Sequence, residues 1–392
     1  MAKSSNDCDA SLLVFADDWG RHPSSCQHLV RHLLDRCQVT WVNTIGTRTP
    51  RLDMATLKRG MEKLGHWFTR QKSTIPLPAN LAVINPRMWP WFGSTWGRKL
   101  NRRLLVRHLT PIIQSMPQPV VAVTTIPVVS DLIAVLPVVR WVYYCVDDFG
   151  LWPGLDSRTL ESMETCLIAG ADTLVAASDT LREKLATHGR SAHLLTHGVE
   201  LDFWAAPTNN SACTELDSLE RPLVVFWGVV DRRMDVGFVQ CLAADMQRGT
   251  IVMVGPEADP DPALHRIPRM RRLGPVTFER LPCIAQQAAV LIMPYADLPV
   301  TRAMQPLKLK EYLATGKPTV VRDLPANRDW ADCLDLAATP EVFSQAVRQR
   351  LESGLPRDQQ HARTRLAAES WTEKARAFAE WTLSPQSSSV GA

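Results

Sequence analysis

The chain has 392 residues, which is too long for one hydrophobic core and fits two domains of ordinary size. Its composition, 45% hydrophobic and 21% charged, is that of an ordinary globular protein, and a net charge of only +4 argues against a nucleic-acid partner. The nine cysteines form no CxxC pair and no His/Cys cluster of the metal-binding type, so we expect free thiols in the cytoplasm.

Two segments bear on targeting. Residues 1–10 lack the basic start and apolar core of a signal peptide, which predicts that the protein is not exported. Residues 119–146 form the most hydrophobic window, but Asp131 and Arg140 interrupt it and Pro127 and Pro137 divide it. We therefore expect two buried strands around a short helix there, and no membrane span.

Strand and helix patterns alternate along the first half of the chain. Residues 11–16 form a short apolar run, apolar residues then recur at helical spacing as far as Leu34, and residues 38–42 predict a second strand. Further strands are expected at 81–84, 120–124, 141–146, 173–177 and 192–195. This alternation predicts a doubly wound parallel sheet in an N-terminal domain of residues 1–205.

A polar stretch, residues 206–221, has no apolar period and predicts an interdomain linker. A second α/β domain follows over residues 222–370. Its strands are expected at 223–227, 250–254, 290–293, 319–321 and near 333–336, and a helix at 342–351. Residues 371–392 predict a last helix, which we expect to pack back across the N-terminal half, and a frayed tail.

Residues 304–321 are the most informative run. Lys308 and Glu311 are three positions apart on a predicted short helix between two strands, so their side chains share one face near the helix N-terminus. Ligands of such βαβ units bind at the carboxyl ends of the strands, where a helix N-terminus favours an anion. Lys308 is thus suited to a phosphate and Glu311 to a sugar diol. The alternative is a solvated helix face.

The run Pro-Leu-Lys-Leu-Lys-Glu-Tyr-Leu-Ala-Thr-Gly-Lys-Pro, residues 306–318, resembles the donor-nucleotide motif of GT-B-fold glycosyltransferases. The resemblance implies an α/β, GT-B architecture of two facing Rossmann-like domains with the ligand cleft between them. It implies that Glu311 binds the ribose of a nucleotide sugar and that Lys308 contacts its pyrophosphate. Many retaining members carry a second Glu eight positions upstream, where this chain has Ala303, so the residue that supports the transferred sugar is not identified.

Further donor-binding candidates follow the first strand of the second domain. Gly228 lets the backbone approach a ligand, and Arg232 and Arg233 offer guanidinium forks that suit a diphosphate. Two adjacent arginines on a loop are alternatively plain surface charges. Gly274 lies in a segment that resembles the family's loop beside the base, which implies a donor contact there as well.

In the N-terminal half, Asp147 and Asp148 end a predicted strand. Related transferases place a polar residue there near the anomeric carbon, which implies a catalytic role for one of the two. The alternative is an acidic pair that caps the next element. Asp18, Trp19 and Arg21 occupy the first strand-to-helix loop, where similar enzymes touch a sugar, and we expect them to bind the acceptor.

Residues 51–107 are strongly basic and rich in tryptophan and phenylalanine. Cations and indoles together favour the surface of an anionic membrane, which would suit a polyprenyl-linked acceptor at the inner face of the membrane. A nucleic-acid partner and a purely structural helical cover are the alternatives. No recognisable nucleic-acid-binding module supports the former.

Together these features predict a bacterial glycosyltransferase that moves a sugar from a nucleotide-diphosphate sugar to a glycan or lipid-linked acceptor in cell-surface or exopolysaccharide biosynthesis. We expect retention of anomeric configuration, no cofactor beyond the donor substrate, and no metal. Asp-x-Asp triplets at residues 7–9 and 259–261 are interpreted as incidental. A nucleotide-sugar epimerase or phosphorylase of the same fold and a non-catalytic nucleotide-sugar-binding scaffold are the alternatives.

Overall fold

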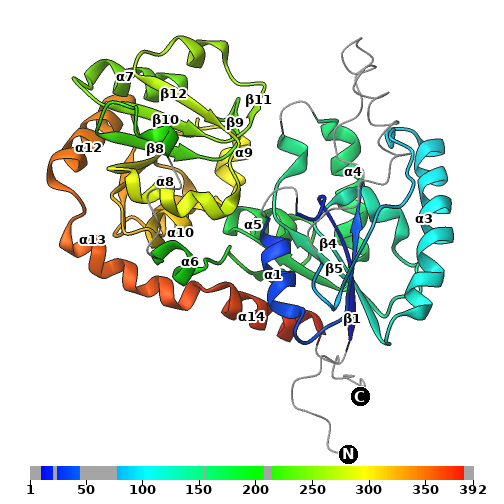
Figure 1. The fold of residues 1–392 in the computed structure, drawn as a ribbon. Helices are drawn as coiled ribbons and strands as arrows, with labels where there is room; N and C mark the ends of the chain where they lie inside the picture. The colour runs from blue at the N-terminus through cyan, green and yellow to red at the C-terminus, as the bar shows by residue number, and fades with distance from the viewer. Residues whose placement is uncertain (1–9, 21–23, 45–76, 153–154, 207–213, 384–392) are drawn as a thin grey trace, which may run out of the picture. The chain divides into compact units, whose positions relative to one another are not determined.

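The computed structural model describes residues 10–20, 24–44, 77–152, 155–206 and 214–383. The chain divides into two compact units, the first of Met1–Leu195 with Ala375–Ala392 and the second of Thr196–Lys374. In Figure 1 the blue-to-green segments and the red end of the chain belong to the first unit, and the green-to-orange segments to the second. Residues 196–205 thus pack with the second unit, ahead of the expected linker.

A sheet of seven parallel strands, in the order β3-β2-β1-β4-β5-β6-β7, forms the first unit. Its strands are β1 (Ser11–Ala16), β2 (Val39–Asn43), β3 (Leu81–Ile84), β4 (Val120–Thr124), β5 (Arg140–Cys145), β6 (Thr173–Ala176) and β7 (His193–Leu194). The described helices are α1 (Ser25–Leu33), α3 (Thr95–Ser115), η1 (Pro127–Leu132), η2 (Phe149–Leu151), α4 (Ser157–Gly170) and α5 (Asp179–Thr187). The strand order reverses at β1, as in a doubly wound fold.

Local sequence explains where these helices start. Ser24, Ser94, Asp156 and Ser178 are N-caps, and each side chain accepts a hydrogen bond from a backbone N–H of the first turn. The core behind them includes β1, whose six residues are all buried and, apart from Ser11, apolar. The end of α14 (Trp371–Leu383) also packs in this unit, where Trp381 stacks on His193 with ring centroids 4.5 Å apart.

The second unit has a six-stranded parallel sheet in the order β12-β10-β8-β13-β14-β15. Its strands are β8 (Leu223–Trp227), β10 (Thr250–Val254), β12 (Met270–Gly274), β13 (Val290–Met293), β14 (Thr319–Arg322) and β15 (Asp335–Ala337), beside a small pair of β9 (Val230–Asp231) and β11 (Glu257–Ala258). The order reverses between β8 and β13, and this switch point is where α/β sheets bind ligands.

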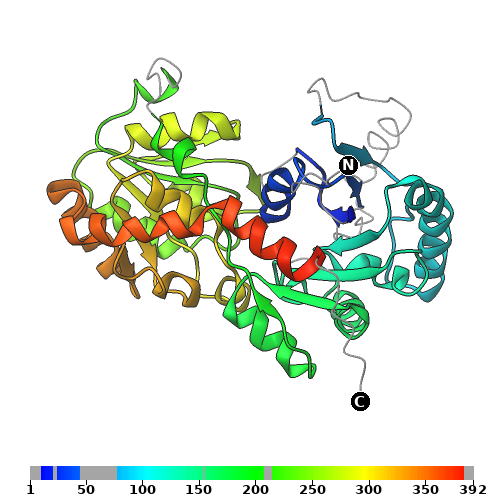
Figure 2. The same cartoon turned by 90° about the horizontal axis from the view of Figure 1, so that it is seen from below.

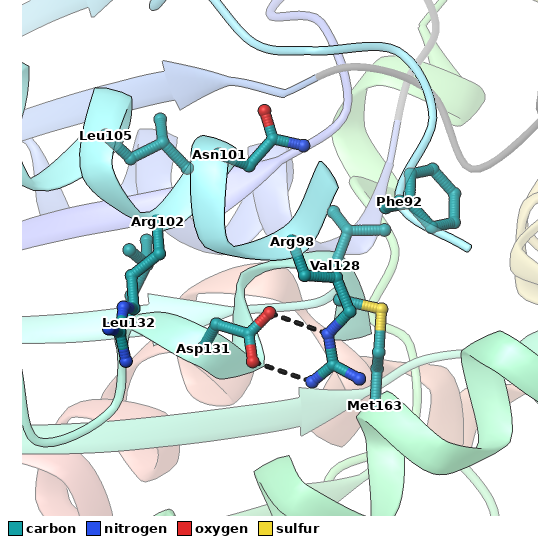
Figure 3. A pocket seen from close by; sticks show the side chains of 9 residues that line it. All are labelled: Phe92, Arg98, Asn101, Arg102, Leu105, Val128, Asp131, Leu132 and Met163. Carbon is teal, nitrogen blue, oxygen red and sulfur yellow. Dashed lines mark hydrogen bonds and ion pairs between the residues drawn. The ribbon is translucent and has the colours of Figure 1, made fainter. Parts of the chain in front are cut away.

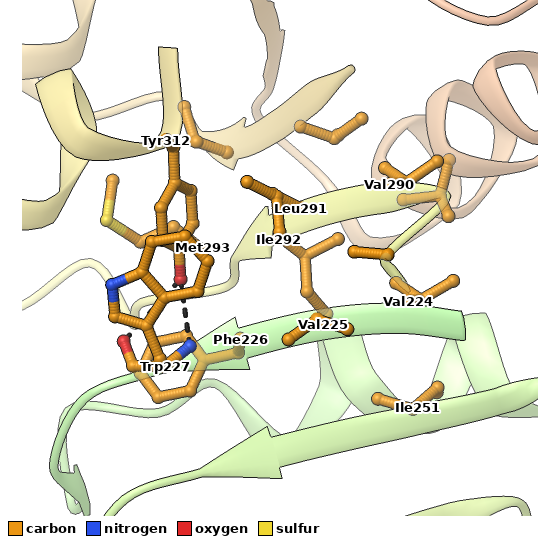
Figure 4. Close-up of a cluster of buried hydrophobic side chains, with 14 of the residues drawn as sticks. Val224, Val225, Phe226, Trp227, Ile251, Val290, Leu291, Ile292, Met293 and Tyr312 are labelled. Carbon is orange, nitrogen blue, oxygen red and sulfur yellow. Dashed lines mark hydrogen bonds between the residues drawn. The ribbon is translucent and has the colours of Figure 1, made fainter. Parts of the chain in front are cut away.

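Helices surround this second sheet (Figures 1 and 2), with α7 packed on α12 and α10 packed on α6. The helices are α6 (Leu201–Ala205), α7 (Val236–Asp245), η4 (Pro262–Arg266), η5 (Phe278–Arg280), α8 (Leu281–Gln287), α9 (Pro299–Ala303), α10 (Leu307–Ala314), α11 (Pro325–Arg328), α12 (Pro340–Ser353), α13 (Arg357–Ala362) and η6 (Arg363–Glu369). Figure 4 shows the core, in which Val225 of β8 and Ile292 of β13 pack side by side, with Trp227 and Tyr312 at one end.

Most strand predictions are confirmed, including the two strands and short helix of residues 119–146. Strand β12 was missed because it is a sheet edge whose Arg271 and Arg272 are exposed, so its sequence lacks a buried apolar run. The short strand expected near 333–336 is confirmed as β15, with its bounds shifted to Asp335–Ala337. Among the described residues, no helix combines the length and the apolar character needed to cross a bilayer.

The expectation of free thiols holds for six cysteines and is wrong for Cys37, which is disulfide-bonded. Sequence spacing could not show this bond, because pairing depends on which sulfurs the fold brings together.

Candidate functional site

Three adjacent strands of the second unit end in glycine at the same edge of the sheet. Gly228 follows β8, Gly255 follows β10, and Gly274 ends β12. The Gly228 N–H donates to the carbonyl of Val254 at 2.8 Å. Gly228 and Gly255 both have a φ of 136°, and a Cβ on Gly255 would lie 2.1 Å from the carbonyl oxygen of Gly228. Only glycine fits at Gly228 and Gly255, which leaves bare backbone for a ligand to approach.

Lys308 lies against this glycine edge, in the first turn of α10. A Cβ on Gly228 would be 2.2 Å from its Nζ. The ammonium donates to the Tyr295 hydroxyl at 2.5 Å and lies 4.5 Å from the centre of the Phe226 ring. Within the described residues it forms no ion pair, so its charge is held by aromatic rings and a neutral hydroxyl. An ammonium in this state, at a helix N-terminus, suits an anion.

Glu311 lies one turn further along α10 and is 7% exposed. Its Oε2 accepts a hydrogen bond from the Trp227 indole at 3.2 Å. Burial raises the pKa of the carboxyl to about 7, against the opposing effects of that hydrogen bond and of the Lys308 charge. The alternative of a solvated helix face is therefore wrong for Glu311. Such a carboxylate can accept hydrogen bonds from a diol.

Aromatic packing fixes the position of the Trp227 indole, which binds Glu311. The Trp227 ring stacks on Trp204 at 5.3 Å with an interplanar angle of 9°, and meets the Tyr312 ring edge-on at 4.2 Å. The Trp227 backbone N–H also donates to the Tyr312 hydroxyl at 3.0 Å, drawn dashed in Figure 4. Strand β8 and helix α10 are thereby joined at the point where Lys308 and Glu311 lie.

The two predicted arginines differ sharply in their surroundings. Arg233 is buried and donates to both carboxylate oxygens of Asp231, at 2.8 Å from Nη2 and 3.0 Å from Nε, so its charge is already matched inside the protein. The Arg232 side chain is 54% exposed and lies 3.4 Å from the exposed carboxylate of Asp259. Such an exposed pair is weak, which leaves Arg232 the more available of the two for an external anion.

The same helix carries a buried lysine, Lys310, to which the sequence analysis assigned no role. Lys310 is 2% exposed, pairs with the Glu369 carboxylate and donates to the Thr196 hydroxyl at 3.0 Å. Burial lowers the pKa of Lys310 to about 8, although Glu369 opposes the shift. Lys374 also pairs with Glu369, at 2.7 Å. The sequence did contain one indication that Lys310 is buried. A helix that connects two parallel strands packs on the sheet, so part of its surface is not exposed to solvent.

Comparisons with solved structures cover nearly the whole chain. Sucrose-phosphate synthase of Thermosynechococcus elongatus matches 95% of this chain and 98% of its own, with a TM-score of 0.71 and 13% identity. HepE of Anabaena, in complex with UDP and glucose, matches with a TM-score of 0.65 and 14% identity over the same shares. A trehalose-6-phosphate protein of Escherichia coli, bound with UDP-2-fluoroglucose, has a TM-score of 0.67 and 12% identity over those shares. The chain has the GT-B fold. These identities establish the fold alone.

Sequence comparison adds one relative. TuaH of Bacillus subtilis, whose name assigns it to teichuronic acid biosynthesis as a glycosyltransferase, is 30% identical over 177 residues. The match spans 43% of this chain and 45% of that protein, so less than half of the relative's length is covered. No protein-family model matches the chain.

In the first GT-B unit, Asp148 belongs to a charged network. Lys184 Nζ donates to Asp148 Oδ1 at 2.9 Å and to Glu164 Oε2 at 2.5 Å, and Glu164 is 2% exposed. Tyr143 donates to the other oxygen of Glu164 at 2.7 Å. Burial lowers the pKa of Lys184, but the carboxylates of Glu164 and Asp148 outweigh this effect, so the pKa is raised overall. Asp147 lies half-buried beside this network, and the roles of both aspartates stay predictions.

The predicted acceptor residues follow β1. Both Asp18 and Trp19 are half-buried, and Arg21 lies outside the described residues. The Trp19 backbone N–H donates to Asn43 Oδ1 at 2.9 Å, and Asn43 donates to Asn85 Oδ1 at 2.8 Å. Sequence reasoning missed these two asparagines, although each lies at the carboxyl end of a strand, where polar side chains of a parallel sheet gather.

Figure 3 shows a small hollow in the first unit, in which Arg98 donates to both carboxylate oxygens of Asp131 at 2.6 and 2.8 Å. This ion pair fixes the start of α3 against η1, and its charges are matched, so we assign the hollow no ligand. Across the described part of the chain, no three His, Cys, Asp or Glu side chains are grouped so as to hold a metal ion.

Proposed function

We propose that the chain is a glycosyltransferase that moves a sugar from a nucleotide-diphosphate sugar to a glycan or lipid-linked acceptor. The observation that carries the proposal is that α10 presents two groups at this edge of the sheet: Lys308, which forms no ion pair among the described residues and lies against Gly228, and the buried carboxyl of Glu311. Three points support it: the GT-B fold, the UDP and UDP-sugar complexes of HepE and the trehalose-6-phosphate protein, and the name of TuaH.

In the proposed reaction the bond between the anomeric carbon and the diphosphate oxygen breaks, and the acceptor hydroxyl forms the new glycosidic bond as it gives up its proton. Lys308, Arg232 and the α10 N-terminus stabilise the negative charge that develops on the leaving diphosphate. Glu311 accepts from the ribose hydroxyls, and the backbone at Gly228 and Gly274 lies against the donor.

The finer assignments belong to the same proposal. We place Asp147 or Asp148 near the anomeric carbon, and Asp18 and Trp19 at the acceptor. The reaction retains anomeric configuration, needs no metal, and takes place in the cytoplasm at the inner face of the membrane, during synthesis of a cell-surface polysaccharide. The membrane contact is made within residues 51–107, of which 51–76 lie outside the described residues, and nucleic acid is not a partner. Retention and metal independence rest on the family resemblance and on the charge that Lys308 supplies.

A second candidate is a non-catalytic scaffold that binds nucleotide sugars. Ala303 favours it, because this buried methyl stands where many retaining GT-B enzymes carry a carboxylate. A scaffold would bind the donor without transferring or hydrolysing it, whereas an epimerase or phosphorylase would act on the donor without a glycan acceptor.

The test is a binding and turnover screen with UDP, GDP, ADP, dTDP and their sugar conjugates. Binding to the folded state must raise the melting temperature. We expect one base to be selected, Glu311→Ala to abolish the selective shift, and chelation by EDTA to leave turnover unchanged. Absence of a shift with every nucleotide would overturn the proposal, and NMR assignment of an inverted product anomer would overturn retention.

A further inference from the structure

Three tryptophans of the first unit form an exposed cluster just before and at the start of α3. Trp89, Trp91 and Trp96 are 37%, 38% and 63% exposed. The ring of Trp89 lies 5.1 Å from that of Trp91 and 5.8 Å from that of Trp96, between centroids. Single exposed apolar side chains are ordinary, but two indoles packed around a third in water are costly and indicate a surface that another phase or molecule covers.

The cluster is held in place by buried contacts. Asn101 is 6% exposed; its Oδ1 accepts from the backbone N–H of Trp89 at 2.6 Å and its Nδ2 donates to the Trp89 carbonyl at 2.9 Å. Gly97 allows the segment to lie on the helix, since a Cβ there would be 2.3 Å from the carbonyl oxygen of Trp91. Specific packing therefore presents these indoles outward.

Within its own segment of the chain, the cluster is flanked by charge of one sign; the acidic neighbours come from other elements, where Asp131 pairs with Arg98 and Asp156 lies beside Gly93. Residues 77–116 contain no Asp and no Glu. On α3, Trp96, Lys99, Arg103 and Arg107 follow one another at spacings of three and four, which places them on one helix face, with Arg102 beside them. These four cations, the α3 cations, are exposed and form no ion pair within the described residues. Figures 1 and 2 show α3, in cyan, on the outside of the first unit's sheet.

We propose that the tryptophan cluster and the α3 cations form one docking surface for an anionic lipid bilayer. Indoles rest at headgroup depth, with the ring in apolar surroundings and the N–H in wet ones, and cations beside them are attracted to lipid phosphates. The indoles pack against one another as one apolar body, whereas single-stranded nucleic acid requires separate ring faces for successive bases. The lipid surface is therefore the partner that this chemistry fits.

The inference rests on the proposed function in one respect, since a bilayer would bring the protein to a lipid-linked acceptor. Its test does not depend on sugar transfer. Sedimentation of the full chain with vesicles of phosphatidylcholine alone, and of equimolar phosphatidylglycerol and phosphatidylcholine, measures the lipid partition coefficient at low and high salt. We expect binding to the anionic vesicles alone, and weaker binding at high salt.

Two variants and two matched controls decide between a specific and an unspecific surface. Each cation near an anionic surface contributes about fivefold to partition, so Lys99→Ala/Arg103→Ala/Arg107→Ala is expected to lose about a hundredfold. Trp96→Ala is expected to lose about tenfold. The controls remove three exposed arginines of the second unit, Arg248, Arg266 and Arg271, or one exposed apolar side chain, Val139, and are expected to bind as the parent chain does.

Equal partition for the α3 variants and their controls would overturn the proposal. So would binding of heparin or single-stranded RNA with no binding to anionic vesicles. Melting temperature and nucleotide binding, measured on every variant, separate the two proposals: a chain that binds nucleotide and ignores vesicles refutes only the docking surface, and the converse refutes only the proposed donor site.

Discussion

Replacement of Glu369 by glutamine leaves the ammonium of Lys310 buried without its counter-charge. Lys310 is 2% exposed and Lys374, a second cation, lies beside the same carboxylate. An uncompensated buried charge costs about 3–5 kcal/mol, but the amine can instead lose its proton. Because the folded pKa of Lys310 is about 8, loss of the proton from Lys310 costs nothing near pH 9 and about 3 kcal/mol at pH 6.

The penalty of Glu369→Gln at pH 6 should therefore exceed that at pH 9 by about 3 kcal/mol, which is about 6–12 °C in melting temperature for a unit of this size. In the parent chain the folded pKa of Lys310 lies below its ordinary 10.5. The unfolded chain then binds more protons between pH 8 and 10.5, so the Lys310 contribution to stability rises with pH across that window.

Differential scanning calorimetry at both pH values measures the effect. Lys310→Met in the Glu369→Gln background removes the buried charge and should restore most of the loss at pH 6. The same penalty at pH 6 and pH 9, or no recovery in the double variant, would refute the reasoning.

Glu311→Gln should raise the stability of the protein by about 3 kcal/mol at pH 8 and weaken donor binding at least about tenfold. Because the folded pKa of Glu311 is about 7, this carboxyl lowers the stability of the parent chain as pH rises from 4.5 to 7. Scanning calorimetry of the variant should show no such decrease. Gly228→Ala drives a methyl into the Lys308 ammonium and should weaken nucleotide-diphosphate binding about tenfold by titration calorimetry, whereas Gly354→Ala, strained but uncrowded, should not. Asp148→Asn should lower kcat at least about a hundredfold if Asp148 acts at the anomeric carbon; a loss of about 1 kcal/mol of stability with kcat intact would limit it to its ion pair with Lys184.

The strand pattern and the Lys308–Glu311 spacing could be predicted from sequence because both depend on local periodicity. The buried strands β8 and β13 are continuous apolar runs, and two residues three apart on a helix must share a face. Burial of Glu311 did not follow from spacing, because it depends on Trp227 from a strand more than 80 positions away.

Sequence also could not predict which charged side chains form ion pairs, because this too depends on the folded structure. Asp231 forms an ion pair with Arg233, and Arg232 stays exposed. Since both residues are arginines on one loop, the sequence could not show which of them is paired. Lys184 binds Asp148, which lies 36 positions away in the sequence, and Lys310 binds Glu369, which lies 59 positions away. Edge strand β12 was missed because its exposed arginines mask the strand pattern.

Titration calorimetry of nucleotide diphosphates against the parent chain and Lys308→Ala tests the central claim most directly. Arg248→Ala, the loss of an exposed cation elsewhere in the second unit, is the matched control. We predict that one nucleotide diphosphate binds the parent chain and the control alike, and binds Lys308→Ala at least about tenfold more weakly because the diphosphate loses its cation. Equal affinity for all three proteins, with the variants folded, would contradict the account.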